Sequence, residues 1–269
     1  MKKKWIRIVE LCLVLTLLAG GFMIVHQIRE DRSAAQSSLR AAAIAGLPPA
    51  GESGPPASPQ TAADPESAPA PEDPPEEVPL SGVDLAALQE VNGDVVGWIE
   101  VPGTELSYPL LQGEDNRYYL NRSWEKERNR GGSVFMECTN SRDLTDYHTI
   151  LYAHRMRNDS MFGTLKYYRD PDYVREHPSV YIASSDGVYR YDVFAAYEAW
   201  VRDILYRSDL EESGLEAEFL DYCVASSEIA PGVTPEEGER ILTLSTCTGD
   251  GHATRWVVQA VLRETWPAE

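Results

Sequence analysis

The sequence has few cysteines, four in 269 residues. Cys12 lies in an apolar run near the N-terminus, which leaves Cys138, Cys223 and Cys247. Three thiols cannot all pair within one chain, so at least one is unpaired or pairs between chains. A domain of this size with so few cysteines does not depend on a disulfide framework. The cysteine left over is therefore a candidate nucleophile.

The sequence also lacks the closely spaced cysteine and histidine pairs that are typical of structural zinc sites. Four residues could in principle ligate zinc, namely Cys223, Cys247, His154 and His252, but a single pair among them is close in sequence. A zinc site is therefore the weaker interpretation of these side chains.

Positive charge is scarce in most of the chain. Residues 81–269 hold 17 Lys and Arg against 33 Asp and Glu, a net charge of −16. An acidic surface argues against binding to nucleic acid and against close contact with anionic lipid. We therefore expect no nucleic-acid partner.

The N-terminal residues 1–32 follow another pattern. MKKKWIR precedes a run without charge from Leu11 to Ile28, near the lower length limit for a membrane-spanning helix. Because the basic residues come first, the N-terminus should be cytoplasmic and the rest of the chain extracellular. A cleaved signal peptide is the alternative, with LLAGG as a weak cleavage site. A buried core helix fits poorly with the segment that follows.

Residues 33–80 are rich in proline, alanine and serine and contain no aromatic residue. They hold 11 of the 18 prolines, and their later part, PESAPAPEDPPEE, carries only negative charge. Such a composition cannot bury enough apolar surface to offset the entropy lost on ordering. It predicts a disordered linker that precedes one folded domain at residues 81–269.

The domain itself has a strand-rich pattern. VVGWIEV, GGSVFMEC, HTILYAH, PSVYIAS and VYRYDVFAAYEAW are enriched in Val, Ile, Tyr and Phe, and ILTLSTC and RWVVQAVL close the chain. Helical spacing occurs at Asp84–Val91, Met161–Tyr168 and Glu216–Glu228. About eight strands with few helices predict an antiparallel barrel with helical insertions.

The final hairpin brings a thiol and a guanidinium together. ILTLSTC ends in Cys247, and the returning strand begins at Arg255. The two leucines of the first strand share one face, whereas Ser245 and Cys247 share the other. If the leucines point into the barrel, Cys247 faces outward or toward a cleft. Arg255 would lie across the hairpin, where a cation favours the thiolate and can hold an oxyanion.

A thiol nucleophile also needs a group that exchanges protons. His154 ends the strand TILYAH and precedes the polar turn RMRNDS, a position where catalytic residues concentrate. A structural histidine is the alternative there. His148 begins a strand, His177 precedes a proline in a polar turn, and His252 lies in the hairpin loop. We interpret His177 and His252 as surface residues.

The segments that hold Cys247, Arg255 and His154 are similar in sequence to those of a known protein family. ILTLSTC followed by an arginine resembles the active-site signature of sortases, the transpeptidases that attach proteins to the Gram-positive cell wall. The segments NGDVVGWIEVPGTELSYPLLQGEDNRYYLN, GGSVFMECTN and HTILYAHRMRNDSMFGTLKYY resemble class B sortases in the same order. The resemblance covers Leu85 to Leu262. It implies a closed eight-stranded barrel with N-terminal and inserted helices, preceded here by the membrane helix and the linker.

The resemblance assigns roles to individual residues. Cys247 matches the nucleophile, His154 the general acid and base, and Arg255 the residue that binds substrate and steadies the oxyanion. The positions that match the substrate groove are Asn116, Leu120, Tyr152, Ser245, Leu205 and Tyr206. Two departures from the family are YAH in place of YGH and a short loop between the cysteine and the arginine.

The resemblance also implies a reaction. The Cys247 thiolate would cleave a sorting signal after threonine, in a motif of the type Asn-Pro-x-Thr, and form a thioacyl-enzyme. An amine from a peptidoglycan precursor or a pilin would then accept the acyl group. The partners would be surface proteins that carry sorting signals, with the membrane bound through the N-terminal helix. The family reaction needs no metal or organic cofactor.

Two other interpretations of the domain remain open at this point. One is a secreted cysteine peptidase, in which water resolves the same thioester. The other is a non-catalytic surface barrel whose cysteine is a buried structural residue.

Overall fold

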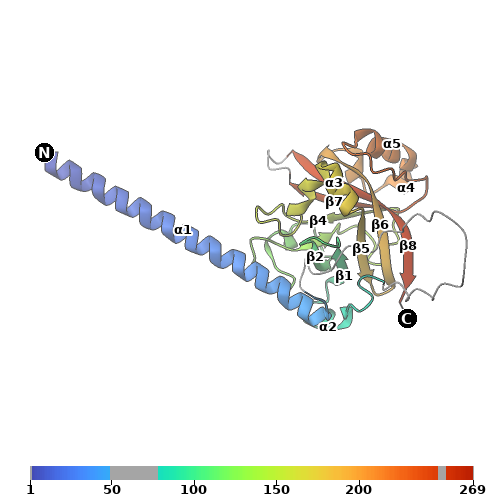
Figure 1. Cartoon of the computed structure of the whole chain (residues 1–269), viewed down its shortest axis with the longest axis horizontal. Helices are drawn as coiled ribbons and strands as arrows, with labels where there is room; N and C mark the ends of the chain where they lie inside the picture. The colour runs from blue at the N-terminus through green and yellow to red at the C-terminus, as the bar shows by residue number, and fades with distance from the viewer. Residues whose placement is uncertain (1, 49–77, 248–252, 269) are drawn as a thin grey trace, which may run out of the picture.

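Eight strands form a closed barrel in the computed structural model, which describes residues 2–48, 78–247 and 253–268 (Figure 1). Neighbouring strands follow the order β1-β2-β3-β4-β7-β8-β6-β5. Their bounds are β1 (Val95–Glu100), β2 (Ser107–Leu111), β3 (Val134–Met136), β4 (His148–Tyr152), β5 (Ser179–Ser184), β6 (Gly187–Trp200), β7 (Ile241–Cys247) and β8 (Thr254–Pro267). The expected closed eight-stranded barrel is confirmed.

Two strand pairs correct the expectation of an antiparallel barrel. β2 pairs with β3 in parallel, and β4 pairs with β7 in parallel, whereas the other six neighbouring pairs are antiparallel. A parallel pair needs a long crossover connection, and the chain supplies one between each pair. Along β4 and β7 the register runs to Tyr152 opposite Ser245. The two strands therefore end at the same edge of the barrel.

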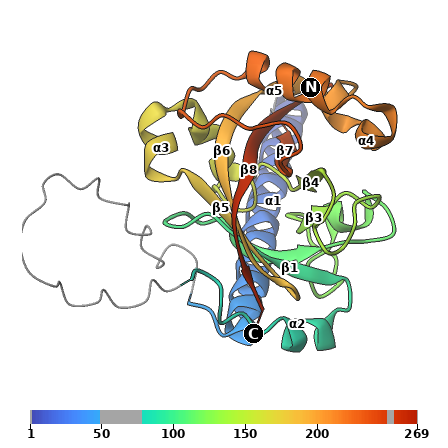
Figure 2. The same ribbon diagram turned by 90° about the vertical axis from the view of Figure 1, so that its right-hand side faces the viewer.

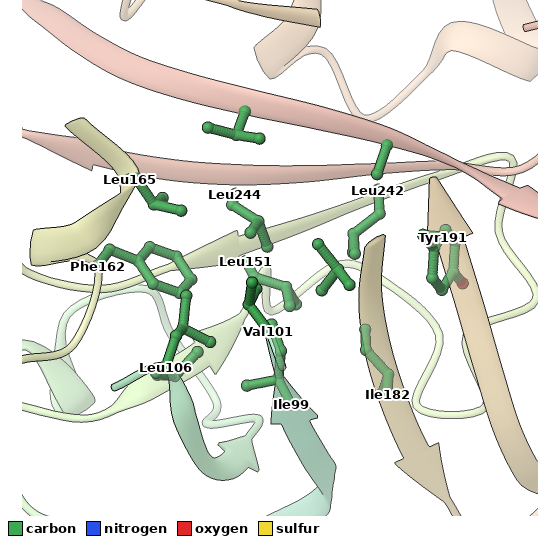
Figure 3. Close-up of a cluster of buried hydrophobic side chains, with 14 of the residues drawn as sticks. Ile99, Val101, Leu106, Leu151, Phe162, Leu165, Ile182, Tyr191, Leu242 and Leu244 are labelled. Carbon is green, nitrogen blue, oxygen red and sulfur yellow. The ribbon is translucent and has the colours of Figure 1, made fainter. Parts of the chain in front are cut away.

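The barrel interior is filled by alternate residues of the strands. Leu242 and Leu244 of β7 are buried in the main core, where Figure 3 shows them with Leu151, Ile99 and Phe162. Burying one such leucine contributes about 1.5–3 kcal/mol. The expectation that the two leucines point into the barrel is confirmed. Because side chains alternate along a strand, the other face of β7 is left for polar residues.

Short helices cover the outside of the barrel. Their bounds are α2 (Leu85–Val91), α3 (Pro171–Glu176), α4 (Leu210–Ser213) and α5 (Glu216–Ser226). Three short 3₁₀ turns accompany them, at Tyr118–Asn121, Gly163–Arg169 and Ile204–Tyr206. The carboxylate of Asp84 caps α2 by accepting a hydrogen bond from the Ala87 amide. Both views place α4 and α5 at one end of the barrel, with α2 and the C-terminus at the other (Figures 1 and 2).

The helix α1 (Lys2–Ala45) departs from the expected linker. Residues 33–45 are helical instead of disordered, and Ala41 and Ala45 are fully buried against the barrel. The Trp124 indole N–H donates to the Ser37 carbonyl at 2.9 Å, and Arg40 pairs with Glu125 at 2.8 Å. The segment SAAQSSLRAAAIA favours helix, and its small side chains allow close packing. The remainder of the predicted linker, residues 49–77, lies outside the described residues.

Helix α1 extends away from the barrel toward its N-terminal end (Figure 1). In the part of the chain that the structure describes, no helix has the combined length and apolar character that a bilayer crossing requires. The membrane-spanning segment expected at Leu11–Ile28 is thus not confirmed and stays a prediction.

Candidate active site

One edge of the barrel brings the three expected catalytic positions to the same level. Tyr152 of β4 lies opposite Ser245 of β7 in a parallel register. His154 and Cys247 each follow two residues later. Across the antiparallel β7–β8 hairpin, Cys247 is paired with Arg255. For Cys247 the structure describes the backbone alone. The expected place of Arg255 across the hairpin from Cys247 is confirmed.

A groove of about 480 Å³ opens at this edge. Its volume falls in the range of about 300–1,000 Å³ that is usual for ligand sites. It contains His154, Arg255 and five of the six residues expected to bind substrate. The described lining residues are Asn116, Leu120, Phe135, Tyr152, Ala153, His154, Val201, Tyr206, Ser245, Thr246 and Arg255.

Leu205 is the expected groove residue that the structure places elsewhere. Its side chain is fully buried in a cluster outside the barrel, together with Phe219 of α5. Leu205 and Tyr206 share one 3₁₀ turn, and Tyr206 is the residue that reaches the groove. The Tyr206 hydroxyl is hydrogen-bonded to the Ser245 hydroxyl at 2.8 Å.

Four lining residues were missed by the sequence analysis, and one of them is Ala153, which lies between Tyr152 and His154. Phe135, Val201 and Thr246 lie on three different parts of the chain, at β3, just after β6 and within β7. Phe135 is paired with Tyr152 across β3 and β4, and the two rings are 5.5 Å apart. Strand parity does not indicate Thr246, because this residue shares the face of Leu242 and Leu244. Phe135 and Val201 depend on pairings that a single sequence does not reveal.

The His154 ring is held in one tautomer. Its Nε2 atom lies 2.8 Å from the Leu120 carbonyl oxygen. A carbonyl can only accept a hydrogen bond, so Nε2 must carry a proton. In the neutral ring the lone pair that exchanges protons is then on Nδ1. Since Leu120 also lines the groove, the same residue lines the groove and orients the His154 ring.

Gly132 keeps the Leu120 carbonyl in place. Its φ angle is +63°, and a Cβ added there would lie 2.6 Å from the Tyr119 carbonyl oxygen and 2.8 Å from that of Leu120. Only glycine adopts this conformation and tolerates this approach without strain. The loop before β3 can therefore pass directly beneath the carbonyl that binds His154.

The other described histidines have structural surroundings. The His148 ring is buried, its Nε2 lies 2.8 Å from the Thr243 hydroxyl, and desolvation lowers its pKa to about 3. The His177 Nδ1 atom lies 2.9 Å from the Pro102 carbonyl oxygen. His177 is partly exposed, so the expected surface position is confirmed only in part. His252 lies outside the described residues. Of the histidines that the structure describes with their side chains, His154 is the one in the groove.

The two other thiols of the domain are kept protonated. Burial, followed by a hydrogen bond to the Glu137 carboxylate, raises the pKa of Cys138. Burial raises the pKa of Cys223 to about 11. Both are free thiols, and neither favours the thiolate at neutral pH. Within the described ranges, no three His, Cys, Asp or Glu side chains are grouped to hold a metal ion.

Comparison with known proteins agrees with this geometry. The family model of the sortase domain matches residues 99–263. The chain belongs to the sortase family. Sortase B of Staphylococcus aureus is 37% identical over 161 residues, which cover 60% of this sortase and 66% of that protein, just under two thirds. Sortase B of Listeria monocytogenes is 34% identical over 181 residues, which cover 66% and 74% of the two chains.

The solved structures that resemble this chain include class B sortases. The Staphylococcus aureus sortase B–substrate complex matches with a TM-score of 0.63 and 35% identity, over 66% of this sortase and 84% of that chain. A Streptococcus pyogenes class B sortase involved in pilus biogenesis matches with a TM-score of 0.60 and 29% identity, over 68% and 100%. This chain is therefore a class B sortase, and sortases are cysteine transpeptidases.

Proposed function

We propose that this sortase cleaves a sorting signal after a threonine and transfers the new acyl end to an amine. The Cys247 thiolate attacks the threonine carbonyl, and the downstream peptide leaves as an amine, which gives a thioacyl-enzyme. His154 donates the proton that the leaving amine needs and later accepts one from the incoming amine. That amine attacks the thioester and releases the Cys247 sulfur. Arg255 stabilises the oxyanion in both steps.

The observation that carries this proposal is the shared register at the barrel edge. Backbone pairing sets Cys247 against Arg255, and the parallel β4–β7 pair sets His154 at the same level. His154 and Arg255 both line one groove. A sorting signal of the type Asn-Pro-x-Thr and an acceptor amine from a peptidoglycan precursor or a pilin are the substrates we propose, by similarity to the family.

The test is capture of the intermediate. A peptide with the sorting signal, incubated with the protein, should give a mass adduct on Cys247 that an added amine removes as a transpeptidation product. Cys247→Ala should give no adduct, whereas Cys138→Ala and Cys223→Ala should retain most activity because both thiols are protonated. A peptidyl adduct on the Cys247→Ala protein would overturn the assignment of the nucleophile.

The same experiment separates the two alternatives. A cysteine peptidase would release the same hydrolysis product at the same rate with and without added amine. A non-catalytic barrel would form no adduct, and its Cys247 would react slowly with an alkylating reagent in the folded state. We expect amine-dependent product and rapid alkylation.

We also propose that the catalytic domain lies outside the cell and is anchored through the N-terminal segment. The support is the order of the sequence, in which basic residues precede the uncharged run at Leu11–Ile28. Protease added to intact wall-less cells should remove the catalytic domain. Full protection of that domain until the cells are lysed would overturn this localisation.

A further inference from the structure

A carboxylate lies directly behind the wall of the groove. Glu137 follows β3, and its side chain is half-buried. It is not itself among the described residues that line the groove. It contacts two residues that do line it, Asn116 and Tyr152. Glu137 is therefore placed to act on the groove through other side chains.

The Asn116 side chain is fixed by two partners of opposite kind. Its Oδ1 atom accepts a hydrogen bond from the Cys138 amide at 2.8 Å, and its Nδ2 atom donates to Glu137 Oε1 at 2.6 Å. An amide N–H can only donate and a carboxylate can only accept, so the amide group cannot be reversed. One N–H of the Asn116 amide donates to Glu137. The second N–H takes no part in that hydrogen bond.

The Tyr152 hydroxyl is fixed in the same way. It donates to Glu137 Oε2 at 2.9 Å. A phenol hydroxyl has a single proton, and that proton is used in the hydrogen bond to Glu137. Toward a substrate in the groove, the Tyr152 oxygen can then only accept a hydrogen bond. The wall therefore has a defined polarity, with an N–H at Asn116 and a lone pair at Tyr152.

We propose that Glu137 is a positioning residue that sets this polarity, so that the groove wall binds an N–H or O–H donor of the sorting signal at the Tyr152 oxygen. This inference rests on the proposed function, because it concerns how the same groove binds its peptide. Glu137 does not touch the reacting atoms.

The state of the carboxyl group agrees with this role. Burial alone would raise the pKa of Glu137, but hydrogen bonds from Asn116, Tyr152 and further donors outweigh burial and hold that pKa below its ordinary value. The group is therefore a carboxylate at neutral pH and can accept from both side chains at once. Burial, followed by the Glu137 charge, raises the pKa of Tyr152, so its phenol keeps its proton.

Glu137→Gln tests the proposal with almost no change in shape. Glutamine has one carbonyl oxygen and one NH₂ group, so it can accept from Asn116 only by turning an N–H toward Tyr152. The Tyr152 hydroxyl would then accept from Gln and direct its own proton into the groove, where it meets the substrate donor. We expect KM for the sorting peptide to rise about tenfold, as for the loss of one charge-assisted hydrogen bond. The value of kcat should change by less than about threefold on the same reasoning, since the reacting groups are untouched.

A matched control and a coupled variant sharpen the test. Glu100 is also buried and accepts from the Ser107 hydroxyl at 2.9 Å, but it is not among the described groove residues. Glu100→Gln should leave KM unchanged. In a Tyr152→Phe background there is no hydroxyl to reverse, so adding Glu137→Gln should raise KM by less than about twofold more.

Each outcome decides the proposal. An unchanged KM in Glu137→Gln, or a loss confined to kcat, would overturn the proposal. So would a double variant in which the effects of Glu137→Gln and Tyr152→Phe on KM are fully additive. If Glu137→Gln does not fold, Tyr152→Phe alone must raise KM without lowering kcat, and a normal KM would overturn the proposal. The rate of Cys247 alkylation should stay at the wild-type value throughout. Failure of the proposed function is separate, because it would appear as activity in Cys247→Ala or as no adduct on Cys247 of the wild-type protein.

Discussion

The two ends of β4 carry one histidine each, and the two rings have different surroundings. His148 begins the strand and His154 follows its end. His148 packs against the Phe219 ring of α5, with ring centres 4.6 Å apart, and has a neutral hydroxyl as hydrogen-bond partner. His154 lines an open groove that Arg255 also lines, and it is hydrogen-bonded to a main-chain carbonyl.

Burial accounts for the difference between the two histidines. Helices α4 and α5 cover one end of the barrel (Figure 2). His148 is buried there against Phe219 of α5, and desolvation makes its charged ring unfavourable. The Thr243 hydroxyl that contacts His148 also accepts a hydrogen bond from the Gln259 amide at 3.0 Å, so it can donate its own proton to a neutral His148 ring. At His154, the edge is open and the groove remains accessible to a substrate. Of these two rings, His154 is the one that a substrate in the groove could reach.

The sharpest way to test this comparison is to remove each ring separately. His154→Gln keeps a donor for the Leu120 carbonyl but cannot transfer a proton. Loss of a general acid and base costs about 10²–10⁴ in rate, and we expect about 10³ with little change in Tm. His148→Phe, the matched control, should retain turnover within about threefold because it lies outside the groove. Comparable loss of turnover in both variants would contradict the assignment.

Arg255 offers the next largest effect. It lines the groove, and one guanidinium nitrogen donates to the Thr254 carbonyl at 2.8 Å. A lysine would keep the charge but lose the planar fork of donors. If the guanidinium holds the oxyanion at fixed geometry, Arg255→Lys should cut transpeptidation by about 10²–10³. Exposed Arg202 provides the control, since Arg202→Lys should have no effect.

The measurement for Arg255→Lys pairs turnover with the pH dependence of Cys247 alkylation. A slow variant with unchanged alkylation assigns the arginine to the oxyanion. Near-normal turnover in Arg255→Lys would reject that role and leave only the effect of charge on the thiol.

Gly132 tests whether the tautomer of His154 depends on the Leu120 carbonyl. A Cβ at residue 132 would push against that carbonyl, so Gly132→Ala should displace the His154 ring and lower turnover by about 10–10². Gly214 is the matched control. Its φ angle is +61°, close to the +63° of Gly132, but a Cβ there meets nothing within 4 Å. Gly214→Ala should share the backbone strain of about 1 kcal/mol and keep full turnover. Equal turnover in the two variants would show that Gly132→Ala acts through backbone strain alone, without the contact to the Leu120 carbonyl.

Much of the barrel could be predicted from the sequence, because local patterns determine it. The alternation in ILTLSTC placed Leu242 and Leu244 in the core, and the hairpin placed Arg255 opposite Cys247. The parallel pairing of β4 with β7 could not be predicted this way. It depends on strands that are far apart in the sequence, and no local pattern encodes which of them become neighbours.

The errors have similar physical causes. Leu205 and Tyr206 are adjacent, and the direction of one 3₁₀ turn decides which of them reaches the groove. The segment at residues 33–45 was assigned to the linker by composition. Its alanines pack against the barrel as a helix, and that packing provides the burial that composition alone did not indicate. Glu137 was missed because a carboxylate behind a wall has no sequence signature.

The smallest expected effect concerns the buried end of β4 and stability rather than rate. In the folded protein the pKa of His148 is lowered to about 3, from 6.5 for an unperturbed histidine. Below pH 6.5 the unfolded chain therefore binds a proton that the folded chain does not. The stability due to the neutral ring is fully present above that pH and is lost as the pH falls toward 3. At pH 5.5 the loss should be about 1.4 kcal/mol.

His148→Phe should remove this dependence, because phenylalanine fills the site without titrating. Denaturant unfolding at pH 7.5 and 5.5 measures the pH dependence of the free energy of unfolding. Carboxylates titrate little between these pH values, because their ordinary pKa values lie near 4. We expect the wild-type protein to lose about 1.4 kcal/mol between the two pH values and the variant to lose markedly less. An equal loss in both proteins would mean that another group is responsible. The contrast between the two ends of β4 would then rest on the kinetics of His154 alone.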